Sequence, residues 1–207
     1  MLNQFKIIFW DFDGVIVDSN EIRTQGFSEI FKSHSSKNIK KLIDYHEKNG
    51  GLSRYHKIKY FYENILIKSI SQENIMIYAE LYKKYVLSKL KNEKYLISDS
   101  VNYLKDNFEN KSMHLISASD ETELIELCDF FNISKFFKSI KGSPTTKIDN
   151  IDSIIKLENY SKQFITYIGD SINDYEASVA NDINFIGYNF TDKFKAELKH
   201  IQSFSKL

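Results

Sequence analysis

The sequence has little of what characterises several special classes of protein. Its 207 residues include one cysteine, one proline and seven glycines, which excludes a disulfide-linked scaffold, a collagen-like chain and a flexible low-complexity segment. A net charge is also missing, because 28 basic residues are matched by 28 acidic ones. We therefore expect neither nucleic acid nor an anionic membrane as a partner, and any bound anion must be held by a local group of residues.

Long apolar runs are absent as well. The first apolar run, residues 5–10, is far too short to cross a bilayer, which takes about 20 apolar residues. No targeting segment precedes this run, and the lone Cys128 cannot form an internal disulfide, so we expect a cytoplasmic protein. The composition, with 42% apolar and 14% aromatic residues, is that of a globular protein with one substantial core and room for a smaller inserted module.

Short apolar runs alternate with helical patterns along most of the chain. The runs cover residues 6–10, 114–117, 164–169 and 183–187, with a weaker one at 136–140, and each is cut off by small or polar residues. Helical spacing lies between them, in the sets Val101, Leu104 and Phe108, then Leu124, Leu127 and Phe131, then Ile148, Ile151 and Ile155. This alternation predicts an α/β fold with a doubly wound parallel sheet, whose ligands bind at the carboxyl ends of the strands.

Residues 18–92 break the alternation, because apolar residues recur there at helical spacing only. The pattern is clear in the sets Phe27, Ile30 and Phe31, then Ile39, Leu42 and Ile43, then Ile58, Phe61, Tyr62 and Ile65, then Tyr78, Leu81, Tyr82 and Tyr85. We predict an all-helical domain of about four helices at 18–92, inserted into a core domain formed by 1–17 and 93–207.

Two acidic clusters follow predicted strands. Asp11 and Asp13 come directly after the first strand, with Gly14 to allow a sharp turn, and Asp170 and Asp174 follow a later strand. Ionised carboxylates this close are stable only if they share a cation, and an all-oxygen ligand set suits Mg²⁺. Either cluster alone is readily explained by a helix cap or a solvated surface acid. Two such clusters at strand ends of one sheet favour a metal site.

Two further segments have the chemistry to hold an anion. Ser117, Ala118 and Ser119 end a strand, where a hydroxyl and free amides can bind phosphate oxygens, although Ser119 could instead cap the next helix. Lys147 falls in the first turn of a helix that Thr146 is placed to cap, where the helix dipole disfavours a cation. Such a lysine makes better sense facing an anionic site, and an exposed side chain that bends away is the alternative.

Together, segment 11–19 (DFDGVIVDS), Ser117, Lys147 and segment 169–174 (GDSIND) resemble the four motifs of the haloacid dehalogenase superfamily, in the family's order. The resemblance spans almost the whole chain, and the helical insert resembles the cap domain of the phosphoglycolate phosphatase and β-phosphoglucomutase branch. It implies a Rossmann-like core and Mg²⁺ bound by Asp11, the main-chain carbonyl of Asp13 and Asp170, with Asp174 in support.

The resemblance also implies catalytic roles. Asp11 is expected as the nucleophile, Asp13 as the general acid and base, and Ser117 and Lys147 as the groups that hold the phosphoryl group, with Lys141 as the alternative lysine. Asp at position 13 narrows the chemistry, because family dehalogenases lack this second acid and the similar transport ATPases carry Thr there. A phosphatase or a phosphomutase is left.

The predicted cap gives a hint of the substrate. Segment 51–54 resembles the stretch of β-phosphoglucomutase whose arginine binds the distal phosphate of a sugar bisphosphate, which implies that Arg54 binds this or another anion. Arg23 stands where that enzyme has a histidine tied to mutase cycling, which argues against a mutase. The alternative is that Arg23, Arg54 and Lys57 are solvated surface charges. Segment 46–54 is also similar to proteins of surface-polysaccharide biosynthesis, which favours a sugar phosphate.

The sequence as a whole predicts a Mg²⁺-dependent phosphatase that acts on a small phosphorylated metabolite through an aspartyl-phosphate. A sugar phosphomutase is the alternative within the enzymes, and a catalytically silent phosphate-binding module is the alternative outside them. Because both Asp11 and Asp13 are present, the silent module is disfavoured. We expect a monomer or a small homo-oligomer.

Overall fold

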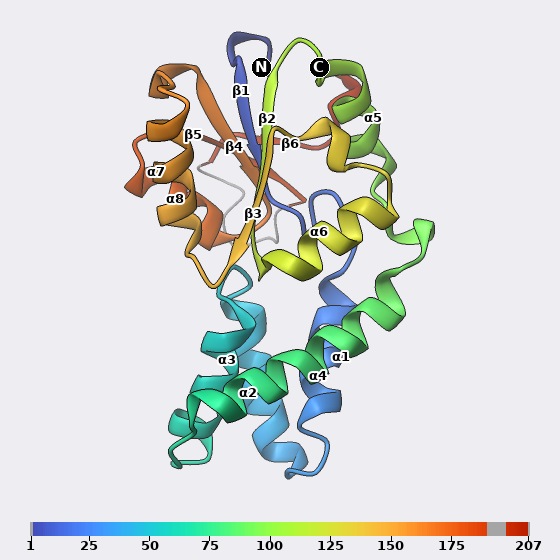
Figure 1. Cartoon of the computed structure of the whole chain (residues 1–207), viewed down its shortest axis with the longest axis vertical. Helices are drawn as coiled ribbons and strands as arrows, with labels where there is room; N and C mark the ends of the chain where they lie inside the picture. The colour runs from blue at the N-terminus through green and yellow to red at the C-terminus, as the bar shows by residue number, and fades with distance from the viewer. Residues whose placement is uncertain (1, 190–197, 207) are drawn as a thin grey trace.

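The core of the molecule is one parallel sheet of six strands, in the order β3-β2-β1-β4-β5-β6 (Figure 1). The computed structural model describes residues 2–189 and 198–206. Its strands are β1 Ile7–Trp10, β2 Ser112–Asp120, β3 Ser139–Ser143, β4 Ile165–Gly169, β5 Asn184–Tyr188 and β6 His200–Ile201. Because β1 lies in the middle and pairs with both β2 and β4, the strand order reverses there, as in doubly wound folds. The predicted fold class is confirmed.

Three strands differ from the prediction. β2 extends beyond residues 114–117 at both ends, and its last residues still pair with β3 after a register shift. β3 begins later than predicted because Phe136 ends a 3₁₀ turn, Ser134–Phe136, and packs its ring against Phe108 at 5.1 Å. β6 is only two residues long, and a pair of residues carries no period that a sequence pattern can reveal.

Helices cover both faces of the sheet, and alternate side chains of β1 contact the helices on opposite faces. Ile8 and Trp10 face the larger apolar cluster with α5 and α6, whereas Ile7 and Phe9 face the smaller cluster with α7 and α8 (Figure 1). These helices are α5 Ser98–Asn107, α6 Glu121–Phe130, α7 Lys147–Leu157 and α8 Ile172–Ala180. The helix predicted from Ile148, Ile151 and Ile155 is present as α7, in which Ile151, Ile154 and Ile155 are buried and Ile148 is exposed.

The helices of the insert stand apart from the sheet, below the carboxyl ends of its strands (Figure 1). They are α1 Asn20–Ile30, α2 Ser36–Lys48, α3 Arg54–Tyr60 with a π-helical continuation Phe61–Ile65, and α4 Gln72–Leu90. Four α-helices agree with the expected number, while the exact domain boundaries stay a prediction. We call α1 to α4 the cap.

Aromatic residues form much of the cap interior. Phe31 stacks on Phe61 with ring centroids 4.1 Å apart, and Phe27 packs against Tyr82 at 4.5 Å. In α4, Ala79, Tyr82 and Val86 face the interior, whereas Leu81 is exposed. No helix in the described part of the chain combines the length and apolar character needed to cross a membrane.

The remaining turns are short 3₁₀ helices at the joints between elements. They span Leu2–Gln4, Glu93–Tyr95, Ser134–Phe136, Lys162–Phe164 and Phe204–Lys206. The turn at Glu93–Tyr95 leads the chain from the cap back to the core, where Leu96 bridges to Val17. Both connections between cap and core therefore meet just beyond the end of β1.

Candidate active site

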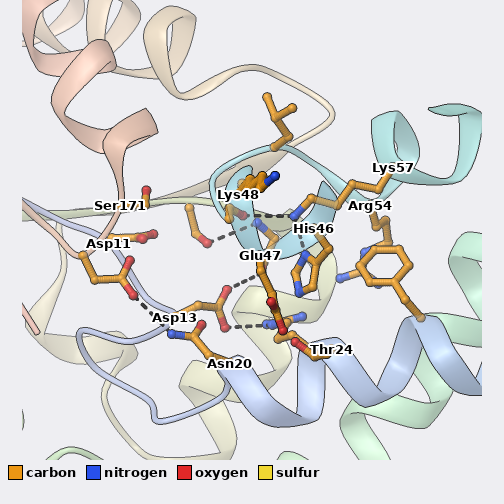
Figure 2. Close-up of a pocket in the computed structure, with 18 of the residues that line it drawn as sticks. Asp11, Asp13, Asn20, Thr24, His46, Glu47, Lys48, Arg54, Lys57 and Ser171 are labelled. Atoms are coloured by element: carbon orange, nitrogen blue, oxygen red, sulfur yellow. Dashed lines mark hydrogen bonds and ion pairs between the residues drawn. The ribbon is translucent and has the colours of Figure 1, made fainter. Parts of the chain in front are cut away.

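A cavity of about 890 Å³ lies between the strand ends and the cap (Figure 2). Its core wall includes Asp11, Asp13, Ser117, Ser119, Lys147 and Asp170. Its cap wall includes Arg23, His46, Lys48, Arg54, Lys57 and Tyr82. A concave site at the carboxyl ends of parallel strands, next to the reversal of strand order, is where doubly wound folds bind their ligands.

The turn after β1 brings the two acidic clusters together. Asp11 still follows the pairing of the sheet, since its backbone N–H donates to the carbonyl of Ile168 at 2.8 Å. The chain then turns at Gly14 with a φ of +76°, and a Cβ atom there would lie 2.0 Å from Asp170 Oδ2. Glycine at this position is therefore required both for the backbone conformation and for the close approach of Asp170.

Asp11, Asp170 and Asp174 form a cluster of carboxylates. One oxygen from each lies within 4.8 Å of the others, and Asp11 and Asp174 are buried. Burial and the neighbouring Asp174 raise the pKa of Asp170 to about 7, and the same two causes raise the pKa of Asp11, against the opposing effect of Lys147. Carboxylates that disfavour one another's charge in this way are stabilised by a shared cation.

The donor set of this cluster fits a hard divalent ion such as Mg²⁺. Asp174 already accepts three donors, because its Oδ1 pairs with Lys147 and its Oδ2 accepts from Ser171 N at 3.0 Å and from Ser171 Oγ at 2.7 Å. Among the described residues, Asp170 accepts one hydrogen bond, from Asn20 Nδ2 at 3.2 Å. Asp11 and Asp170 consequently have oxygens to offer a metal ion, whereas Asp174 is placed to support them.

Lys147 is the lysine that meets this cluster. Its Nζ lies 2.9 Å from Asp11 Oδ1 and also pairs with Asp174, and its side chain is 5% exposed. It is the first residue of α7, a helix that Thr146 caps by accepting a hydrogen bond from Asp149 N at 3.2 Å. Lys141, by contrast, is 44% exposed and approaches only Glu121, at 3.9 Å. Although burial opposes it, the two carboxylates raise the pKa of Lys147, which stays cationic.

Asp13 is held by three donors, two from the start of α1 and one from the end of β2. Its Oδ1 accepts from Ser19 Oγ and from Arg23 Nε at 2.8 Å, and its Oδ2 accepts from Ser119 Oγ at 2.7 Å. Burial acts to raise the pKa of Asp13, but Arg23 and the hydroxyl donors outweigh it, so the pKa is lower than usual. The alternative that Ser119 caps α6 is wrong, because Asp120 caps that helix by accepting from Glu123 N at 3.1 Å.

The segment between β2 and α6 lies beside these acids. Ser117, Ala118 and Ser119 all line the cavity, as the sequence predicted for a phosphate-binding segment. Ser117 Oγ accepts a hydrogen bond from Ser119 N at 3.1 Å. Among the described residues no acceptor takes the hydroxyl proton of Ser117, so this proton can be donated to a bound ligand. Their binding role stays a prediction, and their position is compatible with it.

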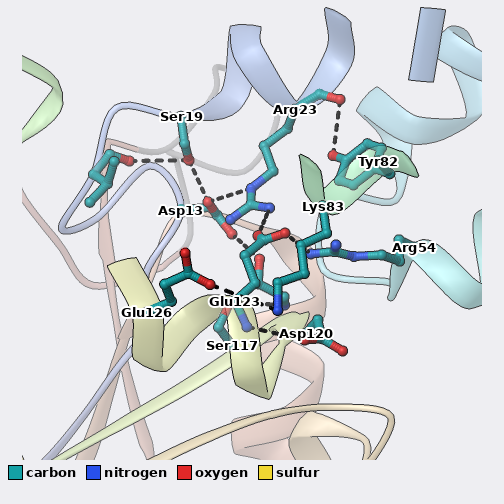
Figure 3. Close-up of polar contacts among 12 residues, drawn as sticks. Asp13, Ser19, Arg23, Arg54, Tyr82, Lys83, Ser117, Asp120, Glu123 and Glu126 are labelled. Atoms are coloured by element: carbon teal, nitrogen blue, oxygen red, sulfur yellow. Dashed lines mark hydrogen bonds and ion pairs between the residues drawn. The ribbon is translucent and has the colours of Figure 1, made fainter. Parts of the chain in front are cut away.

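A buried carboxylate from the core joins two arginines of the cap (Figure 3). Glu123 on α6 is 0% exposed, and its Oε1 pairs with Arg23 of α1 while its Oε2 lies 2.6 Å from Arg54 Nη2 of α3. Arg54 also packs over the ring of Tyr82 at 4.8 Å. Sequence reasoning missed Glu123, because in the pattern of α6 it reads as one more acid in a first helical turn.

The cap wall also contains a buried lysine and a buried histidine. Lys57 is 2% exposed, and its Nζ lies 2.8 Å from His46 Nδ1 and donates to the carbonyl of Gly50 at 3.1 Å. Burial is the main cause that lowers the pKa of Lys57 to about 7 and that of His46 to about 3. Because Arg23, Arg54 and Lys57 are all buried, the alternative that they are solvated surface charges is wrong.

Direct contacts hold the cap against the core around the cavity. Gly51 N donates to Asn173 Oδ1 at 3.1 Å, and a Cβ atom on Gly51 would lie 2.5 Å from the Cβ of Asn173. Tyr55 OH donates to Asp120 Oδ2 at 2.6 Å on the other side of the site. The arrangement described here is thus one in which the cap covers the strand ends.

The fold resembles that of several solved proteins. β-Phosphoglucomutase from Clostridium difficile superposes with a TM-score of 0.78 at 19% identity, over 98% of this chain and 93% of that chain. CbbY from Rhodobacter sphaeroides, a variant solved with xylulose 1,5-bisphosphate, gives 0.78 at 13% identity, over 98% and 96%. A predicted phosphoglycolate phosphatase from Haemophilus somnus gives 0.73 at 14% identity, over 100% and 97%.

No curated protein matches the chain. The family model described as haloacid dehalogenase-like hydrolase matches residues 7–188, a span that includes every element from β1 to β5 and both acidic clusters. This agrees with the resemblance that the four motifs carry and with the geometry in which they meet. The chain therefore belongs to the haloacid dehalogenase-like hydrolase family.

Proposed function

We propose that the protein is a Mg²⁺-dependent phosphatase that hydrolyses a small phosphorylated metabolite, of the sugar phosphate class, through an aspartyl-phosphate on Asp11. The observation that carries the proposal is that two acids in one cavity, Asp11 and Asp13, have different contacts. Lys147 lies against Asp11, whereas Asp13 is fixed by Arg23 and two hydroxyl groups. One acid is thus placed to attack, and the other to exchange protons.

In the first half-reaction, a carboxylate oxygen of Asp11 attacks phosphorus in line with the leaving group. The new bond joins Asp11 to phosphorus, the bond from phosphorus to the leaving oxygen breaks, and Asp13 supplies the proton that this oxygen takes up. Lys147 and Ser117 are positioned to offset the charge of the phosphoryl oxygens. Mg²⁺ held by Asp11, the main-chain carbonyl of Asp13 and Asp170 would neutralise further negative charge there.

In the second half-reaction, Asp13 accepts a proton from water. The resulting hydroxide attacks phosphorus, the bond to Asp11 breaks, and inorganic phosphate leaves with Asp11 restored as a carboxylate. The contacts from Arg23, Ser19 and Ser119 favour the ionised form of Asp13, which is the form that this step needs. They also fix its position, which a proton-transferring group requires.

A sugar phosphate is supported by two observations. The cavity, at about 890 Å³, has room for a small phosphorylated sugar. The solved CbbY variant of the same fold holds a sugar bisphosphate, xylulose 1,5-bisphosphate.

A sugar phosphomutase is the second candidate, because β-phosphoglucomutase shares the fold over nearly the whole chain. In a mutase the phosphoryl group on Asp11 passes to a sugar hydroxyl instead of water. The cytoplasmic location stays a prediction.

The test is phosphate release from a panel of sugar phosphates, phosphoglycolate and nucleotides, with Mg²⁺ or with a chelator. We expect Mg²⁺-dependent release that Asp11→Asn lowers by at least ~10³-fold, because the nucleophile is removed while the fold is kept. Sugar phosphate isomers are measured in the same reactions, since isomerisation without release would favour the mutase. Neither release nor isomerisation by a folded protein would favour the silent binding module.

A further inference from the structure

The buried cations of the cavity wall differ in what neutralises them. Lys147 faces Asp11 and Asp174, Arg23 faces Asp13 and Glu123, and Arg54 faces Glu123. Lys57 is the exception, because no carboxylate of the described residues lies within 4.0 Å of its Nζ. This cation is thus buried beside a site for an anionic substrate without a directly paired counter-charge among the described residues.

The neighbours of Lys57 are neutral acceptors and an aromatic ring. His46 Nδ1 and the Gly50 carbonyl take two of the three ammonium protons, and the ring of Phe27 lies 5.9 Å away. One donor of Lys57 is therefore left without an acceptor in the part of the chain that the structure describes. His46 can accept from Lys57 only as neutral imidazole, and its low pKa keeps it in that form. The histidine thus orients the ammonium group without neutralising it.

Burying a cation in this way costs free energy. Burial lowers the pKa of Lys57, the charge of Asp13 opposes this, and the cations Arg23, Lys147 and Arg54 lower the pKa further. An anion bound next to Lys57 would supply the missing charge and accept its third hydrogen bond. The position suits such an anion, since Lys57 lines the same cavity as Asp11 but on the cap side (Figure 2).

We propose that Lys57, oriented by His46, binds a second anionic group of the substrate, so that the substrate is a phosphate monoester whose leaving group carries a carboxylate or a second phosphate. This inference rests on the proposed phosphatase function and makes its substrate class narrower. It assigns the anion to Lys57 and not to Arg54, whose charge is already matched by Glu123 at 2.6 Å and whose guanidinium packs over Tyr82.

The experiment compares substrates that differ in one anionic group. Three pairs of increasing length replace a carboxylate by a hydroxymethyl group: phosphoglycolate with 2-hydroxyethyl phosphate, 3-phosphoglycerate with glycerol 3-phosphate, and 6-phosphogluconate with glucitol 6-phosphate. A fourth pair, glucose 1,6-bisphosphate with glucose 6-phosphate, tests a second phosphate. The variants are Lys57→Met, Lys57→Arg and, as a matched control, Lys59→Met, which removes a lysine of the same helix whose side chain is 58% exposed and does not line the cavity.

We expect the wild type to favour the anionic member of at least one pair by about 10- to 100-fold in kcat/KM, the effect of one charge-assisted hydrogen bond. Lys57→Met should reduce this ratio to about one, mainly through KM, whereas Lys57→Arg should keep part of it and Lys59→Met nearly all of it. The carboxylate pairs and the bisphosphate pair show which anion is bound.

Binding is measured separately, by titrating the same pairs calorimetrically into Asp11→Asn with Mg²⁺ present. Phosphate release with equal kcat/KM in every pair, or a preference that survives Lys57→Met, would overturn the inference and leave the phosphatase standing. Anion-selective binding that Lys57→Met abolishes, without phosphate release by the wild type, would support the anion site and contradict the phosphatase.

Discussion

The two walls of the cavity carry opposite charge patterns. The core wall brings four carboxylates together, Asp11, Asp13, Asp170 and Asp174, and Lys147 contacts two of them, Asp11 and Asp174. The buried cations of the cap wall are Arg23, Arg54 and Lys57, and the carboxylate that the two arginines share, Glu123, comes from the core. The core wall therefore gains from a bound cation, and the cap wall gains from a bound anion. A phosphate ester accompanied by Mg²⁺ satisfies both.

The walls also differ in how their side chains are positioned. The acids of the core follow the ends of paired strands, where backbone hydrogen bonds of the sheet fix them. The cations of the cap project from helices that are held by ring packing and by the ion pairs to Glu123. The catalytic acids thus lie on the core wall, which the sheet holds in place. The residues that would recognise the substrate lie on the cap wall, where a single substitution can change the surface.

The largest effect is expected on the core wall, from Lys147→Met. Loss of the cation that contacts Asp11 should lower kcat for phosphate release by about 10²–10³-fold. The control is Lys141→Met, which removes the exposed lysine that the sequence left as the alternative and should change kcat less than about twofold. Comparable losses in both variants would mean that the contact of Lys147 with Asp11 is not the catalytic one.

The next effect concerns the joint between the walls. Glu123→Ala leaves Arg23 and Arg54 without their shared carboxylate, and we expect the free energy of unfolding to fall by about 3 kcal/mol. Urea denaturation measures it. Glu126→Ala, one turn along α6, removes a 41% exposed carboxylate and should cost less than about 1 kcal/mol. If the two variants are equally stable, the buried network does not hold the cap to the core.

Metal binding tests the acidic character of the core wall. Mg²⁺ at about 100 times its dissociation constant should stabilise the wild type by about 2.7 kcal/mol, which raises its melting temperature. Asp170→Asn should abolish most of this shift, because it removes a ligand oxygen, whereas Asp152→Asn, an exposed acid on α7, should keep it. A full shift in Asp170→Asn would place the ion elsewhere.

The smallest effect is a gain of stability on the cap wall. The pKa of Lys57 lies at about 7 in the folded protein and at 10.5 ordinarily, so its charged form is disfavoured by folding. The penalty is complete below about pH 7 and disappears as the pH rises towards 10.5. Lys57→Met should therefore be more stable than the wild type by about 2 kcal/mol at pH 6, and this advantage should shrink at higher pH. A destabilised variant at pH 6 would mean that the lysine is structurally required.

The core wall was predictable from local patterns in the sequence, whereas on the cap wall Arg23 and Arg54 were indicated only by the family resemblance. Asp11, Asp13, Asp170 and Asp174 follow apolar strands, and the strand order brings such ends together, so local patterns determined where these acids lie. Gly14 marked the turn between them. The position of Lys147 at an anionic site was predictable too, because a cation in a capped first turn conflicts with the helix dipole.

The cap residues give no comparable local signal. Which face of α3 buries Lys57 depends on how that helix packs against α2 and α4, and spacing along α3 does not contain this information. The partner of Arg23 and Arg54 lies about 100 and 70 positions away along the chain, at Glu123. Ion pairs of this kind are fixed by tertiary packing alone.

The most direct test of the account asks where the phosphoryl group goes. A rapid acid quench of the wild type with Mg²⁺ and a substrate that releases phosphate, followed by borohydride reduction and peptide mass mapping, locates an acyl phosphate. We predict modification of Asp11 alone, and none in Asp11→Asn. Phosphate release without modification of Asp11, or modification of another residue, would contradict the assignment of Asp11 as the nucleophile.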